Sequence, residues 1–244
     1  MMKMVVKILT ASALLALAAC SKNNNVGYGT LHIGLNTDGF VVETTKATVS
    51  DYAEVPGKED FIIEITDSYS TLIWEGRLTE YDPYMLFQAG IYTVTASYGD
   101  ISEEGFAKPY FYGSQDVVIV GDETTEAVVT ASLGNTIVKI ECTERFKKYF
   151  SAYSFSLTRA GTKIMDIPND DSRGVFLDGY SFTIDGVFVS EMRTYEFSKD
   201  FSNLNPATVY SIVFDIDNVG STSISVIFND TVEVIDLGDI ELND

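Results

Sequence analysis

The sequence predicts an all-β fold in which two tandem Greek-key β-sandwich domains follow one another. Apolar and polar residues alternate over most of the chain, as they do in antiparallel strands with one buried face. Turn signals such as Pro56-Gly57 and Gly121-Asp122 separate these stretches. A third observation is a pattern of leucine, turn and tyrosine that occurs once in each half of the chain. Short strands with frequent turns are typical of sandwiches.

The first residues have the layout of a secretory signal peptide. Lys3 and Lys7 precede an uncharged apolar run, Ile8 to Ala19, which is too short to span a bilayer. The run ends in the letters LAAC at Cys20, which resembles the lipobox of bacterial lipoproteins. At such a site the chain is cut before the cysteine and the thiol is acylated. We therefore expect a lipoprotein signal peptide at residues 1–19 and a lipidated tether at 20–28. An ordinary signal peptide with a chance cysteine is the alternative.

Charge and cysteine content restrict the partners of the mature chain. The 244 residues carry a formal net charge of −20. Such a surface repels phosphate backbones, which argues against nucleic acid. If Cys20 carries lipid, Cys142 has no partner for an internal disulfide. In the stretch NTIVKIECT, Cys142 shares a strand face with Val138 and Ile140, so we interpret it as a small buried hydrophobe; a reactive thiol is the alternative.

Period-two alternation marks the individual strands. The predicted inward faces are Leu31, Ile33 and Leu35; Phe61, Ile63 and Ile65; Tyr153, Phe155 and Leu157; and Ile224, Val226 and Phe228. Only the stretch TERFKKYFSAY, residues 143–153, has apolar residues at helical spacing. We expect one short helix there, covering the end of a sheet.

A pattern in the first half recurs in the second. The stretch Leu86–Asp100 aligns with Leu204–Asn218, which matches Tyr92 with Tyr210. Two further pairs align loosely: DFIIEIT with YSFSLT, and GTLHIGL with NTIVKIE. We therefore predict domains at residues 29–133 and 134–244, with so short a linker that they touch. A tyrosine entering a strand after a turn resembles a tyrosine corner, whose hydroxyl bonds to backbone a few residues upstream. This reading makes both stretches scaffold and not a binding site.

Several motifs together resemble a known family. They are GTLHIGLNTDG, TTKA, LFQAGIYTVTASYGD and KPYFYGSQDVVIVGDETT, in that order along the chain. The chain resembles a family of Bacteroidetes lipoproteins catalogued only as a domain of unknown function. Its layout is similar to that of fimbrillin-like surface proteins, whose sandwiches are transthyretin-like or, more broadly, immunoglobulin-like. The resemblance implies an envelope lipoprotein in adhesion or in a fimbria-like assembly, and it brings no catalytic residues. Residues Ser21 to Asn25 lack the acidic residues that often mark surface export, so either face of the outer membrane is left open.

The residue types needed for catalysis or for a metal site are scarce. His32 is the single histidine, and in its strand it points away from Leu31 and Ile33. No nucleophile-elbow motif accompanies it, and one histidine with one buried cysteine makes a poor zinc site. The stretch DIDNVG begins like an EF-hand loop, but Val219 stands where an oxygen ligand belongs. We therefore expect no enzyme activity, no cofactor and no metal site; a looser calcium site in an acidic loop is left open.

Two short segments are candidate sites. In KPYFYG the alternation sends Tyr110 and Tyr112 to one side and Phe111 to the other, and exposed tyrosines can stack on sugar rings. Their alternative role is to start a core strand. Lys46 lies in a polar stretch after the first strand and is a candidate processing site; an ordinary surface lysine is its alternative.

Together these patterns predict a non-enzymatic, lipid-anchored outer-membrane protein that acts in adhesion or as a fimbria-related component. The alternative is a glycan-binding accessory lipoprotein of a polysaccharide-uptake system.

Overall fold

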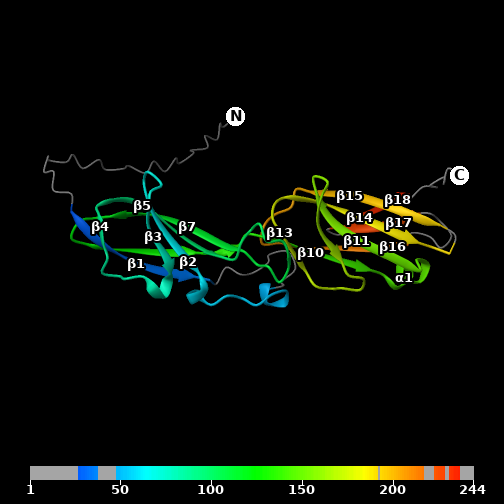
Figure 1. The fold of residues 1–244 in the computed structure, drawn as a ribbon, viewed down its shortest axis with the longest axis horizontal. Helices are drawn as coiled ribbons and strands as arrows, with labels where there is room; N and C mark the ends of the chain where they lie inside the picture. The colour runs from blue at the N-terminus through cyan, green and yellow to red at the C-terminus, as the bar shows by residue number, and fades with distance from the viewer. Residues whose placement is uncertain (1–26, 38–47, 192, 217–222, 229–230, 237–244) are drawn as a thin grey trace, which may run out of the picture.

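The fold is two β-sandwiches arranged end to end along the long axis of the molecule (Figure 1). The computed structural model describes residues 27–37, 48–191, 193–216, 223–228 and 231–236. Strands dominate these ranges, as the sequence predicts, and the one α-helix is short. None of the helices in these ranges is both long enough and apolar enough to span a bilayer.

The first sandwich packs a three-stranded sheet, in the order β4-β1-β8, against a five-stranded sheet, in the order β3-β2-β5-β7-β9. Its strands are β1 (Tyr28–Asn36), β2 (Ile62–Asp67), β3 (Leu72–Arg77), β4 (Leu86–Gln88), β5 (Gly90–Tyr98), β7 (Phe111–Ile119), β8 (Thr124–Thr130) and β9 (Ser132–Leu133). Single 3-10 turns form η1 (Val49–Asp51), η2 (Lys58–Asp60) and η3 (Leu78–Glu80). The predicted inward residues of β1 and β2 do face the core: Leu31, Phe61, Ile63 and Ile65 are all fully buried.

The second sandwich has a four-stranded sheet, in the order β12-β11-β14-β15, and a six-stranded sheet, in the order β18-β17-β16-β10-β13-β6. Its strands are β10 (Thr136–Cys142), β11 (Ala152–Arg159), β12 (Thr162–Ile167), β13 (Val175–Leu177), β14 (Ser181–Val189), β15 (Thr194–Ser202), β16 (Val209–Ile216), β17 (Ser223–Phe228) and β18 (Thr231–Asp236). The predicted helix is α1 (Glu144–Tyr149). It closes the far end of this sandwich, because Phe146 and Phe150 enter the core there.

Both sandwiches use one topology. In the first, β1 pairs with β8 in parallel and with β4 in antiparallel fashion; in the second, β10 does the same with β16 and β13. The series β3-β2-β5-β7 corresponds to β12-β11-β14-β15. The two looser sequence alignments, of β1 with β10 and of β2 with β11, therefore match corresponding strands.

The sharper alignment does not match corresponding strands. It pairs β4 and β5 with β16, whereas the topology makes β14 the counterpart of β5 and β8 the counterpart of β16. The likeness arises because each stretch begins a strand with a tyrosine whose hydroxyl bonds to backbone. Tyr92 donates to the carbonyl of Gln88 at 2.9 Å, and Tyr210 accepts from the N–H of Asn205 at 3.0 Å. Both rings are buried, so the stretches are scaffold, but they are not repeats of one another.

The two sandwiches touch through the connection between β5 and β7. This connection leaves the first sandwich and adds β6 (Gly105–Phe106) to the second, where it pairs with β13. Conversely, Ile137, Phe176 and Val209, from strands of the second sandwich, pack into the hydrophobic core of the first. We propose that the domain boundary falls at Leu133–Gly134, between these two cores.

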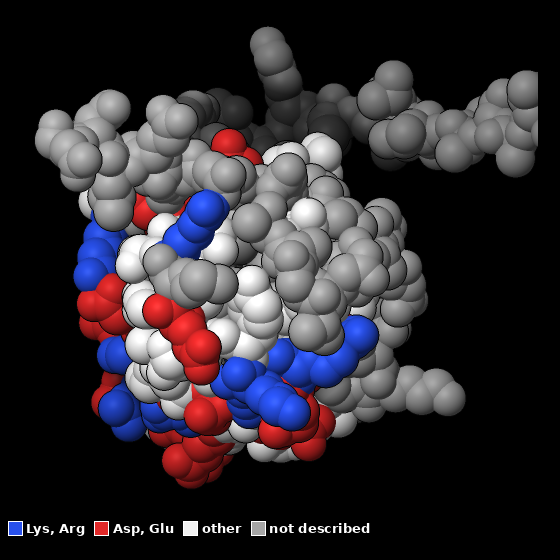
Figure 2. All heavy atoms as spheres, turned by 90° about the vertical axis from the view of Figure 1, so that its right-hand side faces the viewer, with Lys and Arg blue, Asp and Glu red and all other residues white. Residues whose placement is uncertain are grey.

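The described chain begins at one end of the rod and the helix lies at the other. Gly27 and β1 start at the free end of the first domain, whereas α1 lies at the tip of the second (Figure 1). Seen end-on, this tip carries Lys and Arg side chains intermixed with Asp and Glu (Figure 2). The excess of negative charge therefore does not produce a uniformly acidic tip.

Candidate ligand-binding site

The predicted aromatic segment lies where the two domains meet. Phe111 is fully buried against Phe61 and Tyr98, at ring-centroid distances of 6.2 and 6.3 Å. Tyr110 and Tyr112 project to the other side, with parallel rings 6.4 Å apart, and Tyr112 is 45% exposed. Because the Phe111 ring belongs to the core, we narrow the proposed ligand contact to the two tyrosines.

Tyr110 also holds the domain junction. Its backbone N–H donates to Oδ1 of Asn135, and its carbonyl accepts from the N–H of Gly134 at 2.8 Å. Its ring lies over Gly134, where a Cβ atom would come within 2.7 Å of the ring. Only glycine leaves room for the ring there. Burial, helped by nearby Tyr112, raises the pKa of the Tyr110 hydroxyl. Tyr112 is therefore the more accessible of the two rings.

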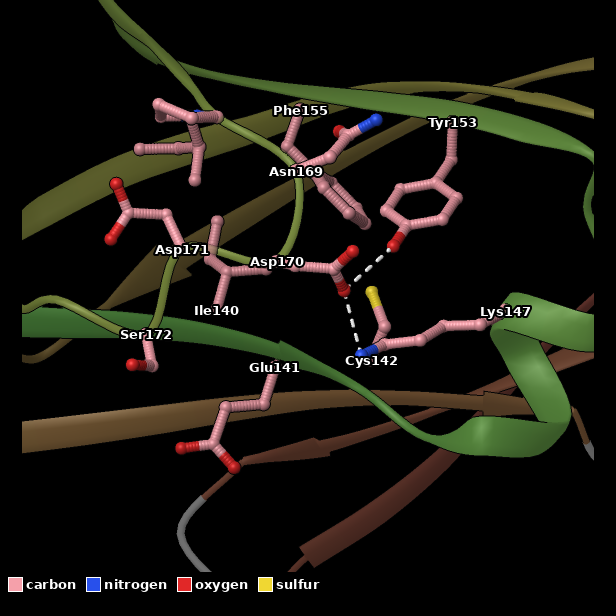
Figure 3. A pocket seen from close by; sticks show the side chains of 12 residues that line it. Ile140, Glu141, Cys142, Lys147, Tyr153, Phe155, Asn169, Asp170, Asp171 and Ser172 are labelled. Carbon is pink, nitrogen blue, oxygen red and sulfur yellow. Dashed lines mark hydrogen bonds and ion pairs between the residues drawn. The ribbon is translucent and has the colours of Figure 1, made fainter.

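A cavity that the sequence did not reveal lies in the second domain (Figure 3). It has a volume of about 310 Å³ and opens between β10 and the segment that follows β12. Its apolar walls include Ile140, Phe155 and Ile167, and its polar groups come from Lys147, Tyr153, Asn169, Asp170 and Ser172. Apolar walls with a few polar groups are the usual composition of a small-ligand site.

Three polar side chains in this cavity converge on one carboxylate. The Tyr153 hydroxyl donates to Asp170 at 3.1 Å, and the Lys147 ammonium lies 2.7 Å from the same oxygen (Figure 3). These bonds, that of Lys147 foremost, lower the pKa of Asp170. The same bond raises the pKa of Lys147. At neutral pH the two charges compensate each other, so the cavity suits a neutral polar ligand better than an ion.

The cavity lacks an activated nucleophile at neutral pH. Burial, together with repulsion from Asp170, raises the pKa of the Cys142 thiol to about 12 although Lys147 opposes the shift. Burial likewise raises the pKa of Tyr153 to about 12, with Cys142 and Asp170 contributing. Both groups therefore keep their protons, and a protonated thiol is a poor nucleophile. Cys142 is partly buried against the domain core, in keeping with its predicted packing role.

Sequence reasoning missed this cavity because its parts come from distant segments. Asn169 to Asp171 was expected to form a turn, and it does: Asp170 has a φ of 59°, in the left-handed region that aspartate tolerates. Its partners lie on α1 and β11. The i to i+3 spacing of Lys147 and Asp170 residues in a helix would have been a signal, but these two residues meet only through the fold.

Other predicted positions have structural roles or lie outside the described residues. Cys20 and Lys46 belong to the latter group. Trp74 packs edge-on against Tyr81, at 5.0 Å between centroids, as expected. In DIDNVG, Asp215 pairs with Arg145 of α1, and the segment after Ile216 lies outside the described ranges. Within those ranges, no group of three or more His, Cys, Asp or Glu side chains is placed to hold a metal ion.

Solved structures with a similar arrangement come from related bacteria. A fimbrial assembly protein of Parabacteroides distasonis matches with a TM-score of 0.47 and 8% identity, over 86% of this chain and 97% of its own. A candidate polysaccharide-binding protein of Bacteroides thetaiotaomicron matches with 0.46 and 11%, over 86% and 98%. The fimbrial anchor protein Mfa2 of Porphyromonas gingivalis matches with 0.44 and 10%, over 84% and 98%. Likeness at this level carries no argument about function.

Sequence comparison gives the family assignment. No curated protein matches the chain. The family described as "Domain of unknown function (DUF4493)" matches residues 27–243, which includes both sandwiches. That span agrees with the resemblance noted in the motifs of the first domain. The chain therefore belongs to the DUF4493 family.

Proposed function

We propose that this protein is a non-enzymatic, outer-membrane-anchored lipoprotein that acts in cell adhesion or as a fimbria-related component. The observation that carries the proposal is the stiff, end-to-end union of its two domains. The chain enters at one end of the rod, and α1 lies at the other (Figure 1). A lipid at Cys20 would hold the first end at the membrane, so the tip of the second domain would be presented to a partner.

A buried clamp supports the stiffness of the rod. Glu104, from the connection between β5 and β7, receives two hydrogen bonds from the Arg159 guanidinium at 2.9 and 2.7 Å. It also accepts the backbone N–H of Asp178 at 2.8 Å. The Glu104 side chain is 14% exposed. Paired donors and a bidentate geometry make such a bond strong and directional. The clamp acts beside the β6–β13 strand pair, so rotation between the domains would break both.

The anchor is tested by substitution at Cys20. A Cys20→Ser chain should lose palmitate label and leave the membrane fraction, because the acyl chain is the proposed anchor. Adherence of cells to a coated surface should fall with it, while the amount of secreted protein stays the same. Protease treatment of intact cells reports which face of the outer membrane carries the protein. Palmitate labelling that persists after the substitution would contradict the anchor, and unchanged adherence would contradict the adhesive role.

Glycan binding is a second candidate function, supported by the parallel tyrosine rings. Tyr110 and Tyr112 face the same side and leave one ring face-accessible, which suits the C–H face of a sugar. Calorimetric titration with soluble polysaccharides would test this function. Tyr112→Ala should abolish binding heat, and Tyr180→Ala, at a solitary tyrosine that is 67% exposed, is the matched control. Equal binding by both variants would remove the tyrosine pair from consideration.

Processing at Lys46 stays a subordinate proposal. Limited trypsin digestion of the soluble chain, followed by size-exclusion chromatography, would test it. A cut after Lys46 that yields oligomers would support a role in assembly. A resistant bond, or a cut product that stays monomeric, would leave Lys46 an ordinary surface lysine.

A further inference from the structure

Exposed apolar side chains gather at the end of the first domain where the described chain begins. We call these residues the basal collar: Tyr28, Leu86, Ile91, Val118 and Val120, which are 55, 64, 56, 61 and 46% exposed. Backbone bonds place them together. The N–H of Ala89 donates to the carbonyl of Gly27, and the N–H of Asp122 donates to that of Tyr28, both at 2.8 Å. Ile91 and Val118 are direct cross-strand partners.

The apolar character is confined to this end of the sheet. One step inward along the same outer face, Thr93 and Asp116 are cross-strand partners, and their side chains hydrogen-bond at 2.7 Å. The following pair, Thr95 and Ser114, is polar as well. Outward positions of a solvated sheet are normally polar in this way. A cluster of exposed aliphatic and aromatic residues at one rim therefore indicates a surface that contacts a partner.

The length of the tether restricts what that partner can be. Only seven peptide units separate Cys20 from Gly27, so the two residues are at most about 25 Å apart even when the chain is fully extended. If Cys20 is acylated, as proposed above, the collar is held within that distance of the membrane. A short tether also gives a high effective concentration, so weak contacts suffice for binding.

We propose that the basal collar rests in the headgroup region of the membrane and sets the rod upright on the lipid surface. Tyrosine and aliphatic side chains favour this interfacial layer. The adjoining turn carries Asp122 and Glu123, which are exposed and would be repelled by anionic headgroups. The surface that fits the collar is therefore zwitterionic lipid. The inference rests on the proposed lipid anchor, but its test does not need native acylation.

The test uses the mature chain from residue 21 with an N-terminal histidine tag, bound to phosphatidylcholine vesicles that contain a nickel-chelating lipid. A fluorophore is attached at Gln88→Cys, beside the collar, or at Lys148→Cys, on α1. Cys142 stays unlabelled because its thiol pKa is about 12. Nitroxide-headgroup lipids serve as quenchers. We expect strong quenching at position 88 and little at position 148.

The collar itself is tested by a double variant, Ile91→Thr with Val118→Thr, which keeps β-branched side chains in both strands. Quenching at position 88 should fall to the level at position 148, whereas Val187→Thr, an exposed valine of the second domain, should leave it unchanged. Addition of phosphatidylglycerol should reduce quenching. Equal quenching at both positions in the parent chain, or no loss in the double variant, would overturn the proposal. Stronger quenching on anionic vesicles would overturn the assignment of zwitterionic lipid. Failure of the anchor proposal would show separately, as absent palmitate label.

Discussion

The two domains share one strand topology but fill it with different side chains. The core of the second domain is built largely from phenylalanines on several strands and on α1: Phe146, Phe150, Phe155, Phe182, Phe188, Phe197, Phe201 and Phe214. The first domain relies mainly on aliphatic residues, with Ala96, Ala127 and Ala131 at close approaches. There Gly113 lies so near β8 that a Cβ would meet the carbonyl of Thr130 at 2.2 Å. The comparison teaches that this topology requires a filled volume and not a particular set of residues.

The domains also differ in how the sheet ends beyond the shared strands. The second domain adds β17 and β18 next to β16. In the first domain the chain passes directly from β8 into β9, which crosses to the other sheet and pairs with β7. One sandwich is therefore widened and the other is closed along this side. Both solutions cover part of an edge that would otherwise offer unpaired backbone groups.

The largest expected effect is on the aromatic core. Phe188 packs against the rings of Phe146, Phe150 and Phe155 at centroid distances of 5.2, 5.3 and 5.4 Å. Phe188→Ala should lower the free energy of unfolding of the second domain by about 3–5 kcal/mol, through lost burial and a cavity. Trp74, the single tryptophan, reports on the first domain, so circular dichroism should change at lower denaturant than its fluorescence. Phe111→Ala is the matched variant in the first domain, and simultaneous transitions in both would contradict independent cores.

The interdomain clamp should come next. Glu104→Gln removes a charge that pairs with Arg159, so we expect a loss of about 2 kcal/mol in coupling between the domains. Two separated unfolding transitions should replace a merged one in scanning calorimetry. The neighbouring Glu103, whose pair with Lys108 is more than half exposed, provides the control. Glu103→Gln should change stability by less than about 0.5 kcal/mol. Equal effects at the two positions would show that burial of the clamp has no special role.

The two tyrosine hydroxyls offer a finer comparison. Tyr92→Phe deprives the Gln88 carbonyl of a donor, whereas Tyr210→Phe leaves the N–H of Asn205 without its acceptor. Each change should cost about 1–3 kcal/mol. Tyr210→Phe should cost more, because an orphaned N–H is tolerated less readily than a carbonyl. Urea denaturation of both variants measures the difference; the reverse order would show that donor and acceptor roles do not decide it.

Acid should open the second domain at its α1 end. Burial of Asp215 raises its pKa, but hydrogen bonds from Thr143 and Arg145 outweigh this and lower it below the ordinary value of 3.8. The pKa of Asp170 is lowered too, first by Lys147. A lowered folded-state pKa means that these bonds stabilise the fold above about pH 4, and that the stabilisation is lost as the pH falls through the folded-state values. Helix signal should therefore fall in that acidic range. Asp215→Asn should weaken the same end at neutral pH, and an unaltered acid profile in this variant would contradict the assignment.

The smallest effect concerns the Cys142 thiol. Its raised pKa of about 12 predicts very slow reaction with a disulfide reagent at pH 8 in the folded protein and fast reaction once the second domain unfolds. With Cys20 replaced by serine, Cys142 is the single thiol and reports on the second domain as Trp74 reports on the first. Rapid labelling of the native chain would show that the cavity admits solvent freely.

The sequence by itself determined the strand content, the inward faces and the short helix. Leu31, Ile63 and Phe155 could be assigned to a core because period-two alternation is a local property of a strand with one buried face. The helix at Glu144–Tyr149 was equally local, since Phe146 and Phe150 repeat at helical spacing. The orientation of Tyr110 and Tyr112 opposite Phe111 followed from the same alternation.

Only the tertiary structure decided which strands correspond and where polar groups meet. The alignment of Tyr92 with Tyr210 misled because a strand start with a tyrosine is a local pattern, whereas correspondence depends on which strands pair across the sheet. Glu104 and Arg159, and likewise Lys147 and Asp170, lie far apart in sequence and have ordinary charged-residue signatures. Nothing local distinguishes them from surface charges, because burial and hydrogen-bond direction arise only when distant segments pack together.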